Sequence, residues 1–174
     1  IDKKRKSINY LNKRKKRYIK NYKSDSHFSI RINANFEEFY PILKKNKKKF
    51  NAVPTHSLNE LINLKKIFPD KLHLQILYYN DKPIGGTLNI IVNNNCGLMF
   101  YNMIDYNYKD LQAASIQIYE SINWAKEHNL YYLDLGVSQL PQSLDPLEPH
   151  KTLIHFKEKV SSIGILRIAI HKKY

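Results

Sequence analysis

Residues 72–136 decide the fold, and they read LHLQILYYNDKPIGGTLNIIVNNNCGLMFYNMIDYNYKDLQAASIQIYESINWAKEHNLYYLDLG. Alternating apolar residues predict three strands, at 72–79, 84–92 and 97–104, joined by turns rich in Asn and Asp. A helical period over about 109–128 and a short apolar run at 131–135 follow. Because a meander feeds one β-α-β crossover, the strands flanking the helix must be parallel. Where two such strands splay apart, a groove opens beside the helix N-terminus.

The rest of the chain supplies further elements around this unit. An amphipathic helix is predicted over about 4–22, with an apolar stripe that needs a partner. The other elements are a strand at 28–32, a helix capped by Asn35, a helix opened by the capping box Ser57–Glu60, a helix at 150–159 and a strand at 164–171. The paired glycines Gly85 and Gly86 indicate a bulge or a close backbone approach.

Composition bounds the class of protein. The 174 residues are 43% apolar, enough for one globular core. No run of 18 apolar residues and no signal-peptide pattern occurs, so we expect a soluble, cytoplasmic protein. The single cysteine, Cys96, excludes an intrachain disulfide, and the scattered histidines match no metal-binding spacing, so no metal is predicted. The chain begins with Ile1 and a basic segment, which suggests a piece of a longer protein.

The positive charge is concentrated in two segments. Residues 1–23 hold eleven Lys or Arg and one Asp, and 44–49 hold five more lysines, within a total net charge of +14. Such segments attract nucleic acid, anionic lipid or a phosphorylated ligand, although a solvated helix face has the same composition. One hypothesis is therefore a non-catalytic binding module that contacts RNA or an anionic surface through Lys13, Arg14, Lys16 and Arg17.

A second hypothesis comes from the order of elements and from four short motifs. These are Lys82-Pro83-Ile84-Gly85-Gly86, Ile122-Asn123-Trp124-Ala125, Leu133-Asp134-Leu135-Gly136 and Phe156-Lys157-Glu158-Lys159. Together they resemble the GNAT acyltransferase fold, an α/β (α+β) fold with a mixed sheet and flanking helices, and within it the FemAB-like or BioF2-like branch. In this resemblance residues 1–24 form a basic linker helix, residues 25–174 form a single GNAT-like domain, and an N-terminal repeat is missing.

The resemblance implies transfer of an acyl or aminoacyl group to an amine acceptor, from acyl-CoA or another activated donor. In acetyl-CoA enzymes of this fold, a glycine-rich turn at the start of the long helix holds the pyrophosphate. Here the corresponding residues 106–114 contain no glycine. Asp110 adds a negative charge there, although it also suits a helix N-cap. We therefore expect weak binding of free acetyl-CoA, no tighter than roughly millimolar.

Six residues are candidates for the site in this hypothesis. Asp134, at the end of a strand expected to be central, is a candidate to orient or deprotonate the amine. Tyr101 is a second catalytic candidate, preferred to Asn102 because Asn102 is expected to share a buried strand face with Leu98, Phe100 and Ile104. The candidates for binding substrate or donor are Lys157, Asn102, Gln112 and Ser138. For each residue a structural role is the alternative.

Overall fold

A computed structural model describes residues 1–33, 35–140, 143–145, 147–165 and 172. The chain forms two compact units, 1–137 and 138–174, and each is described by itself. No helix among the described residues has the length and apolar composition needed to cross a membrane. The predicted boundary between a linker helix at 1–24 and a domain at 25–174 stays a prediction.

The first unit is built on a five-stranded sheet in the order β1-β2-β3-β4-β5. The strands are β1 (Phe28–Ile32), β2 (Leu72–Tyr79), β3 (Lys82–Asn93), β4 (Cys96–Ile104) and β5 (Tyr132–Asp134). β1 to β4 pair antiparallel, and β4 and β5 pair parallel, so the predicted mixed sheet and its parallel neighbours are confirmed. Among the described residues β5 is the outer strand, with Tyr132 65% exposed, whereas a central position was expected.

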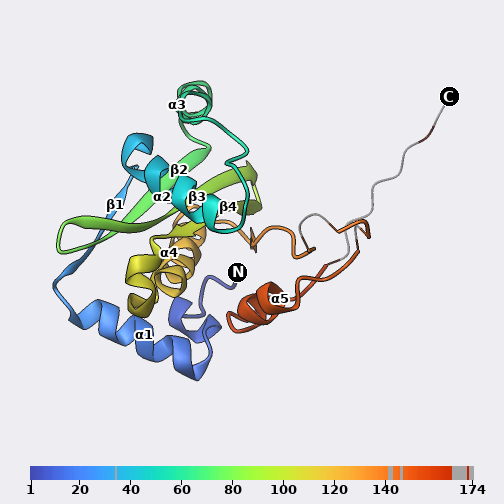
Figure 1. Cartoon of the computed structure of the whole chain (residues 1–174). Coiled ribbons are helices and arrows are strands. Elements are labelled where there is room, and N and C mark those ends of the chain that lie inside the picture. Colours follow the sequence, from blue (N-terminus) through green and yellow to red (C-terminus); the bar gives the residue numbers. More distant parts are fainter. Residues whose placement is uncertain (34, 141–142, 146, 166–171, 173–174) are drawn as a thin grey trace. The chain divides into compact units, whose positions relative to one another are not determined.

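Helices cover both faces of this sheet (Figure 1). The helix α2 (Phe36–Lys49) packs on β3 and β4 and contacts α3 (Leu58–Ile67), while α4 (Ala113–Glu127) also packs on β3 and β4. A Cβ on Gly85 would meet Gln117 of α4 at 2.6 Å, and one on Gly86 would meet Phe39 of α2 at 2.6 Å. Neighbouring strand residues point to opposite faces, so α2 and α4 lie on opposite sides. We call these sides the α2 face and the α4 face.

The close backbone approach predicted at the paired glycines is therefore confirmed. The α2 face carries the larger apolar core, and it includes the alternating residues of β2 that the sequence placed on one face. The buried members of this core are Phe36, Phe39, Leu43, Leu61, Leu72, Leu74, Ile76, Tyr78, Leu88 and Tyr101. The capping box at Ser57 and Glu60 also forms as predicted, with Ser57 Oγ accepting from the Glu60 amide at 3.2 Å.

The basic N-terminal segment is not one continuous helix. A 3-10 turn, η1 (Ser7–Tyr10), precedes α1 (Lys13–Ser24), and the Asn12 side chain caps α1 by accepting from the Lys15 amide. The apolar face of α1 packs against α4, and Ile19 is fully buried. Lys15 is buried there too, and its ammonium donates to Ser115 Oγ at 2.9 Å.

The long helix starts later than the sequence predicted. Residues 106–111 form a 3-10 turn, η2 (Tyr106–Leu111), and α4 begins at Ala113 rather than near Lys109. The residue before the helix is Gln112, whose backbone is left-handed with φ 59°. Asp110 is inside η2, so its predicted role as the N-cap of the long helix is wrong.

A β-bulge in β4 overturns one prediction about strand faces. Met99 pairs with Asn89 and Tyr101 with Leu88, so Phe100 is the extra residue. Leu98 pairs with Ile90 and Asn102 with Thr87, and these two β3 residues point to opposite faces. Asn102 therefore does not share a face with Leu98. Tyr101 is the more deeply buried residue, at 3% exposure, with its ring 4.6 Å from Phe100 and 6.2 Å from Phe39.

The second unit contains the helix α5 (Lys151–Glu158), close to the predicted 150–159. A single antiparallel bridge between Gln139 and Pro149 closes the loop before it. Most of the predicted strand at 164–171 lies outside the described residues, because the structure describes only 164 and 165 of that stretch.

Candidate active site

The parallel strands β4 and β5 stay together over only three residue pairs. Cys96 pairs with Tyr132, Gly97 with Leu133 and Leu98 with Asp134, and pairing stops there. β4 continues to Ile104, while the segment that follows β5 turns at Gly136, whose φ is 75°. Beyond Leu98 that edge of β4 has no partner strand among the described residues, although Gly136 still lies beside it, with the Met99 carbonyl 4.0 Å from the position of a Cβ. The pairing of the two strands therefore ends at Leu98 and Asp134, and the predicted divergence beyond this point stays a prediction.

Asp134 lies where the pairing of the two strands ends. Paired residues of parallel strands point to the same side, so Asp134 shares the α2 face with Leu98. The carboxylate Oδ1 accepts the Gly136 amide at 2.7 Å, which closes a tight turn. This bond matches the structural alternative for Asp134, but it occupies only one of two carboxylate oxygens. The residue is exposed, so the second oxygen is accessible to a ligand.

Asn102 and Gln112 come together on the other face, at the start of α4. The Asn102 amide lies 3.5 Å from the carbonyl of Ala114, at the outer limit for a hydrogen bond. The Gln112 side chain folds back and donates to the Lys109 carbonyl at 3.3 Å, while its own carbonyl accepts from Ser115 and Ile116. Because the Ser115 and Ile116 amides already donate to Gln112, the backbone donors left at the start of α4 are those of Ala113 and Ala114.

The lysine run of α2 reaches the same region. Lys45 Nζ lies 4.0 Å from the Asp105 carboxylate, and Lys49 Nζ lies 3.3 Å from the centroid of the Tyr106 ring. Both partners belong to the segment that leads from β4 into α4. The sequence showed these lysines only as a charge run, because nothing in it indicated that they lie beside η2. Because Lys45 is paired with a carboxylate, the positive potential added to the segment before α4 comes from Lys49.

The loop between α2 and α3 brings a histidine to the bulge of β4. The ring of His56 lies 5.6 Å from the Phe100 ring, and its Nδ1 is buried without a hydrogen bond to any described residue. The Tyr101 hydroxyl faces Thr55 and the backbone of Thr55 and His56, and burial raises the pKa of Tyr101. Tyr101 thus belongs mainly to the apolar core, but its polar end reaches this loop. Sequence reasoning missed His56, since nothing in the sequence indicated that this loop reaches Phe100.

The two remaining candidates meet in the second unit. Lys157 Nζ donates to Ser138 Oγ at 2.8 Å, which joins α5 to the loop that precedes it. Within the described residues, no group of three or more His, Cys, Asp or Glu is placed to hold a metal ion. The sequence-based prediction that the protein binds no metal stays a prediction.

Comparison with protein families gives one match. Residues 11–152 match the family described as "Acetyltransferase (GNAT) domain". No curated protein sequence matches the chain.

Solved structures with the same fold include an acetyltransferase from Streptococcus agalactiae, with a TM-score of 0.62 and 10% identity over 86% of this chain and 92% of that one. The aminoglycoside N-acetyltransferase AAC(6')-Iy, in complex with CoA, gives a TM-score of 0.62 and 14% identity over 86% of this chain and 96% of that one. FemX gives a TM-score of 0.69 and 11% identity over 91% of this chain, but only 56% of FemX is covered.

Proposed function

The chain belongs to the GNAT acetyltransferase family, and on this basis we propose that it transfers an acyl group from an acyl-CoA thioester to an amine. The observation that carries the proposal is the end of the pairing of β4 and β5 after Leu98 and Asp134, with α4 beginning beyond the unpaired end of β4. This arrangement gives an extended donor a row of backbone partners and a helix N-terminus for its phosphates. AAC(6')-Iy, which shares the fold, was solved in complex with CoA.

The donor's phosphates belong at the start of α4 in this proposal. The left-handed backbone at Gln112 is the conformation that glycine usually supplies, so the turn exists without a glycine. Lys49 adds positive charge on the segment before α4, whereas Lys45 is paired with Asp105. Two features still weaken the interaction: the Gln112 side chain packs on this turn, and Asp110 is negative. Binding of free acetyl-CoA near the millimolar range remains the expectation.

The acceptor amine belongs on the α2 face. Asp134 lies on that face, and Phe100, which contacts His56, packs against the apolar core of the same face. In the proposed step the neutral amine attacks the thioester carbonyl, the C–N bond forms, the C–S bond breaks and CoA leaves as the thiolate. Asp134 orients the amine and His56 receives its proton. Assistance of this kind is worth roughly 10²–10⁴ in rate.

Aminoacyl transfer of the FemAB type is a second candidate, favoured by the similarity to FemX over 91% of this chain. The candidate residues of the second unit, Lys157 and Ser138, would then contact the donor or substrate. This activity would use the basic side chains of α1 to hold an RNA-linked donor. A cytoplasmic location, where activated acyl donors are made, is part of either proposal.

The direct assay measures thiol release from acetyl-CoA in the presence of small primary amines. Turnover that depends on the amine and yields the N-acetyl product supports the first candidate. Aminoacyl transfer without acetyl transfer supports the second. If neither group is transferred to any amine at saturating donor, the catalytic proposal fails and the binding-module hypothesis gains.

A further inference from the structure

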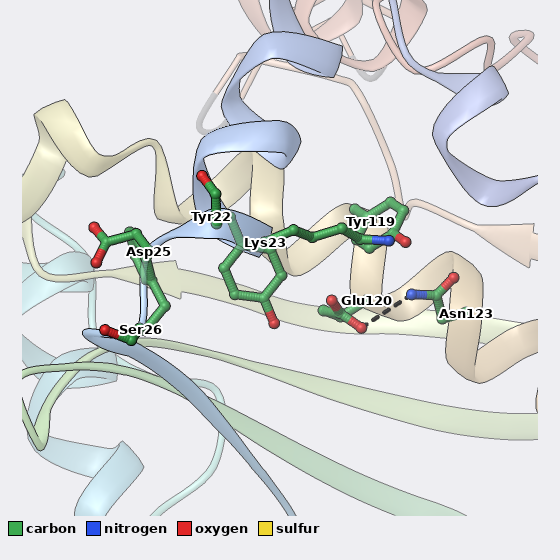
Figure 2. Close-up of a pocket in the computed structure, with 9 residues that line it drawn as sticks. Tyr22, Lys23, Asp25, Ser26, Tyr119, Glu120 and Asn123 are labelled. Atoms are coloured by element: carbon green, nitrogen blue, oxygen red, sulfur yellow. Dashed lines mark hydrogen bonds between the residues drawn. The ribbon is translucent and has the colours of Figure 1, made fainter.

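A pocket of about 480 Å³ lies between the C-terminal end of α1 and α4 (Figure 2). It shares no residue with the candidate active site. Three aromatic rings and three charged side chains line it: Tyr22, Phe28, Tyr119, Lys23, Asp25 and Glu120. Its two carboxylates stand out in a chain with 29 Lys and Arg against 15 Asp and Glu.

Glu120 is a half-buried carboxylate, and the positive charge of Lys23, which lines the same pocket, acts on it without forming an ion pair. Its side chain accepts from the Asn123 amide at 3.0 Å, which Figure 2 marks with a dashed line, and it is also hydrogen-bonded to the Tyr22 hydroxyl. Among the described residues no Lys, Arg or His nitrogen lies within 4.0 Å of it. Burial raises the pKa of Glu120. Burial, together with the charge of Glu120 and a hydrogen bond to it, raises the pKa of Tyr22. A bound cation would favour the ionised carboxylate.

The rings around Glu120 suit an ammonium group. Lys23 Nζ lies 5.0 Å from the centroid of the Tyr119 ring, so an ammonium of the chain itself already uses that ring. Tyr22 and Phe28 meet edge to face, with centroids 5.5 Å apart, and add apolar surface. Asp25 bonds His27 Nδ1 at 2.6 Å and adds negative charge at the rim. A carboxylate next to aromatic rings is the chemistry that recognises organic ammonium ions.

We propose that this pocket is a binding site for an organic primary ammonium ion, with Glu120 pairing the charge and Tyr22 and Tyr119 packing on the carbon chain. A sugar or another neutral polyol is the main rival ligand, since carboxylates, amides and rings also recognise hydroxyl groups. The charge on Glu120 separates the two, because a polyol needs only a hydrogen-bond acceptor there. The site does not depend on the proposed acyl transfer.

Calorimetry at pH 7.5 in low salt, with 1,4-diaminobutane as the probe and 1,4-butanediol as its neutral match, tests this. We expect the diamine to bind with a Kd of about 1 mM or tighter and the diol to show no binding. Glu120→Gln should weaken diamine binding at least about tenfold. Glu37→Gln, which removes the same charge from the exposed first turn of α2 on the opposite face of the sheet, should bind like the unaltered chain.

A map of amide chemical shifts in the unaltered chain gives an independent readout if Glu120→Gln fails to fold. The diamine should shift amides near Tyr22 and from Tyr119 to Asn123. Equal binding of diol and diamine, equal binding by Glu120→Gln, or shifts confined to the β4–β5 divergence would each overturn the proposal. None of these results bears on acetyl transfer, which the thiol-release assay measures separately.

Discussion

Gln112 adopts a backbone conformation that its residue type does not predict. The sequence predicts weak donor binding because residues 106–114 hold no glycine, but Gln112 adopts the left-handed backbone that glycine favours. A non-glycine residue in that region costs roughly 1–2 kcal/mol. Two backbone hydrogen bonds stabilise this conformation at the start of α4. The Gln112 carbonyl accepts from the Ser115 N–H, and the Gln112 backbone N–H donates to the Lys109 carbonyl.

Gln112→Gly should therefore stabilise the domain by roughly 0.5–1 kcal/mol, because glycine adopts this φ without steric cost. It should also tighten acetyl-CoA binding, since the side chain that packs on the turn is removed. Gln112→Ala is the matched control: it removes the same side chain but keeps the backbone strain. Denaturant unfolding and calorimetry measure both quantities. A glycine variant less stable than the alanine variant would contradict this account of the turn.

Asp134 has a structural bond and a proposed chemical role, and one substitution separates them. Asn at 134 keeps an oxygen that accepts from the Gly136 amide, so Asp134→Asn should change stability by less than about 0.5 kcal/mol. Turnover should fall by roughly 10²–10⁴. His56→Gln should give a similar fall in turnover. Unchanged turnover in Asp134→Asn would show that Asp134 has only a structural role, in the turn that it closes with Gly136.

At the level of elements, the bulge in β4 explains the main error of the sequence analysis. Alternation places Leu98, Phe100 and Asn102 on one face, and this holds only for an unbroken strand. The extra residue at Phe100 reverses the pattern, so Asn102 turns toward α4 and Tyr101 enters the core. No turn residue or proline marks the bulge in this sequence. Periodicity alone could not predict which of the two side chains reaches which face.

The helix α1 is an element with two different faces. Ile19 and Lys15 are buried on one side, while Lys13, Arg14 and Arg17 are exposed and Lys16 is half-exposed. Arg14 also donates to the Tyr18 hydroxyl at 2.6 Å, so part of this charge is already held in place. The exposed cations form a short basic face suited to a polyanion.

If that face binds RNA, affinity should fall steeply with salt, because each neutralised phosphate releases counterions. Replacing Lys13, Arg14, Lys16 and Arg17 with Gln should remove most of the binding, and filter or fluorescence titrations at two salt concentrations would measure it. Replacing four exposed lysines outside both basic segments, Lys66, Lys71, Lys82 and Lys151, with Gln is the control for the lost net charge. If RNA affinity changes neither with salt nor with the four substitutions, the exposed cations of α1 do not bind RNA and form only a solvated face.

For the whole molecule, the sequence predicted the architecture well because its signals are local. The meander, the capping box at Ser57, the paired glycines and the parallel crossover each follow from short patterns. The site was predicted less well, because it depends on long-range placement. Lys45 and Lys49 reach η2 across the sheet edge, and His56 reaches Phe100 from a loop. Such contacts join residues more than 40 positions apart, and a single sequence gives no signal for them.

The central claim is that the parting of β4 and β5 holds an acyl-CoA donor. The most direct test is a titration of the isotope-labelled chain with acetyl-CoA, followed by the chemical shifts of its backbone amides, which detects binding in the millimolar range. We predict that the largest shifts fall on three segments, 99–102, 112–115 and 134–136. Saturable binding that shifts other regions and leaves these three unmoved, or no shift at ten millimolar donor, would contradict the account.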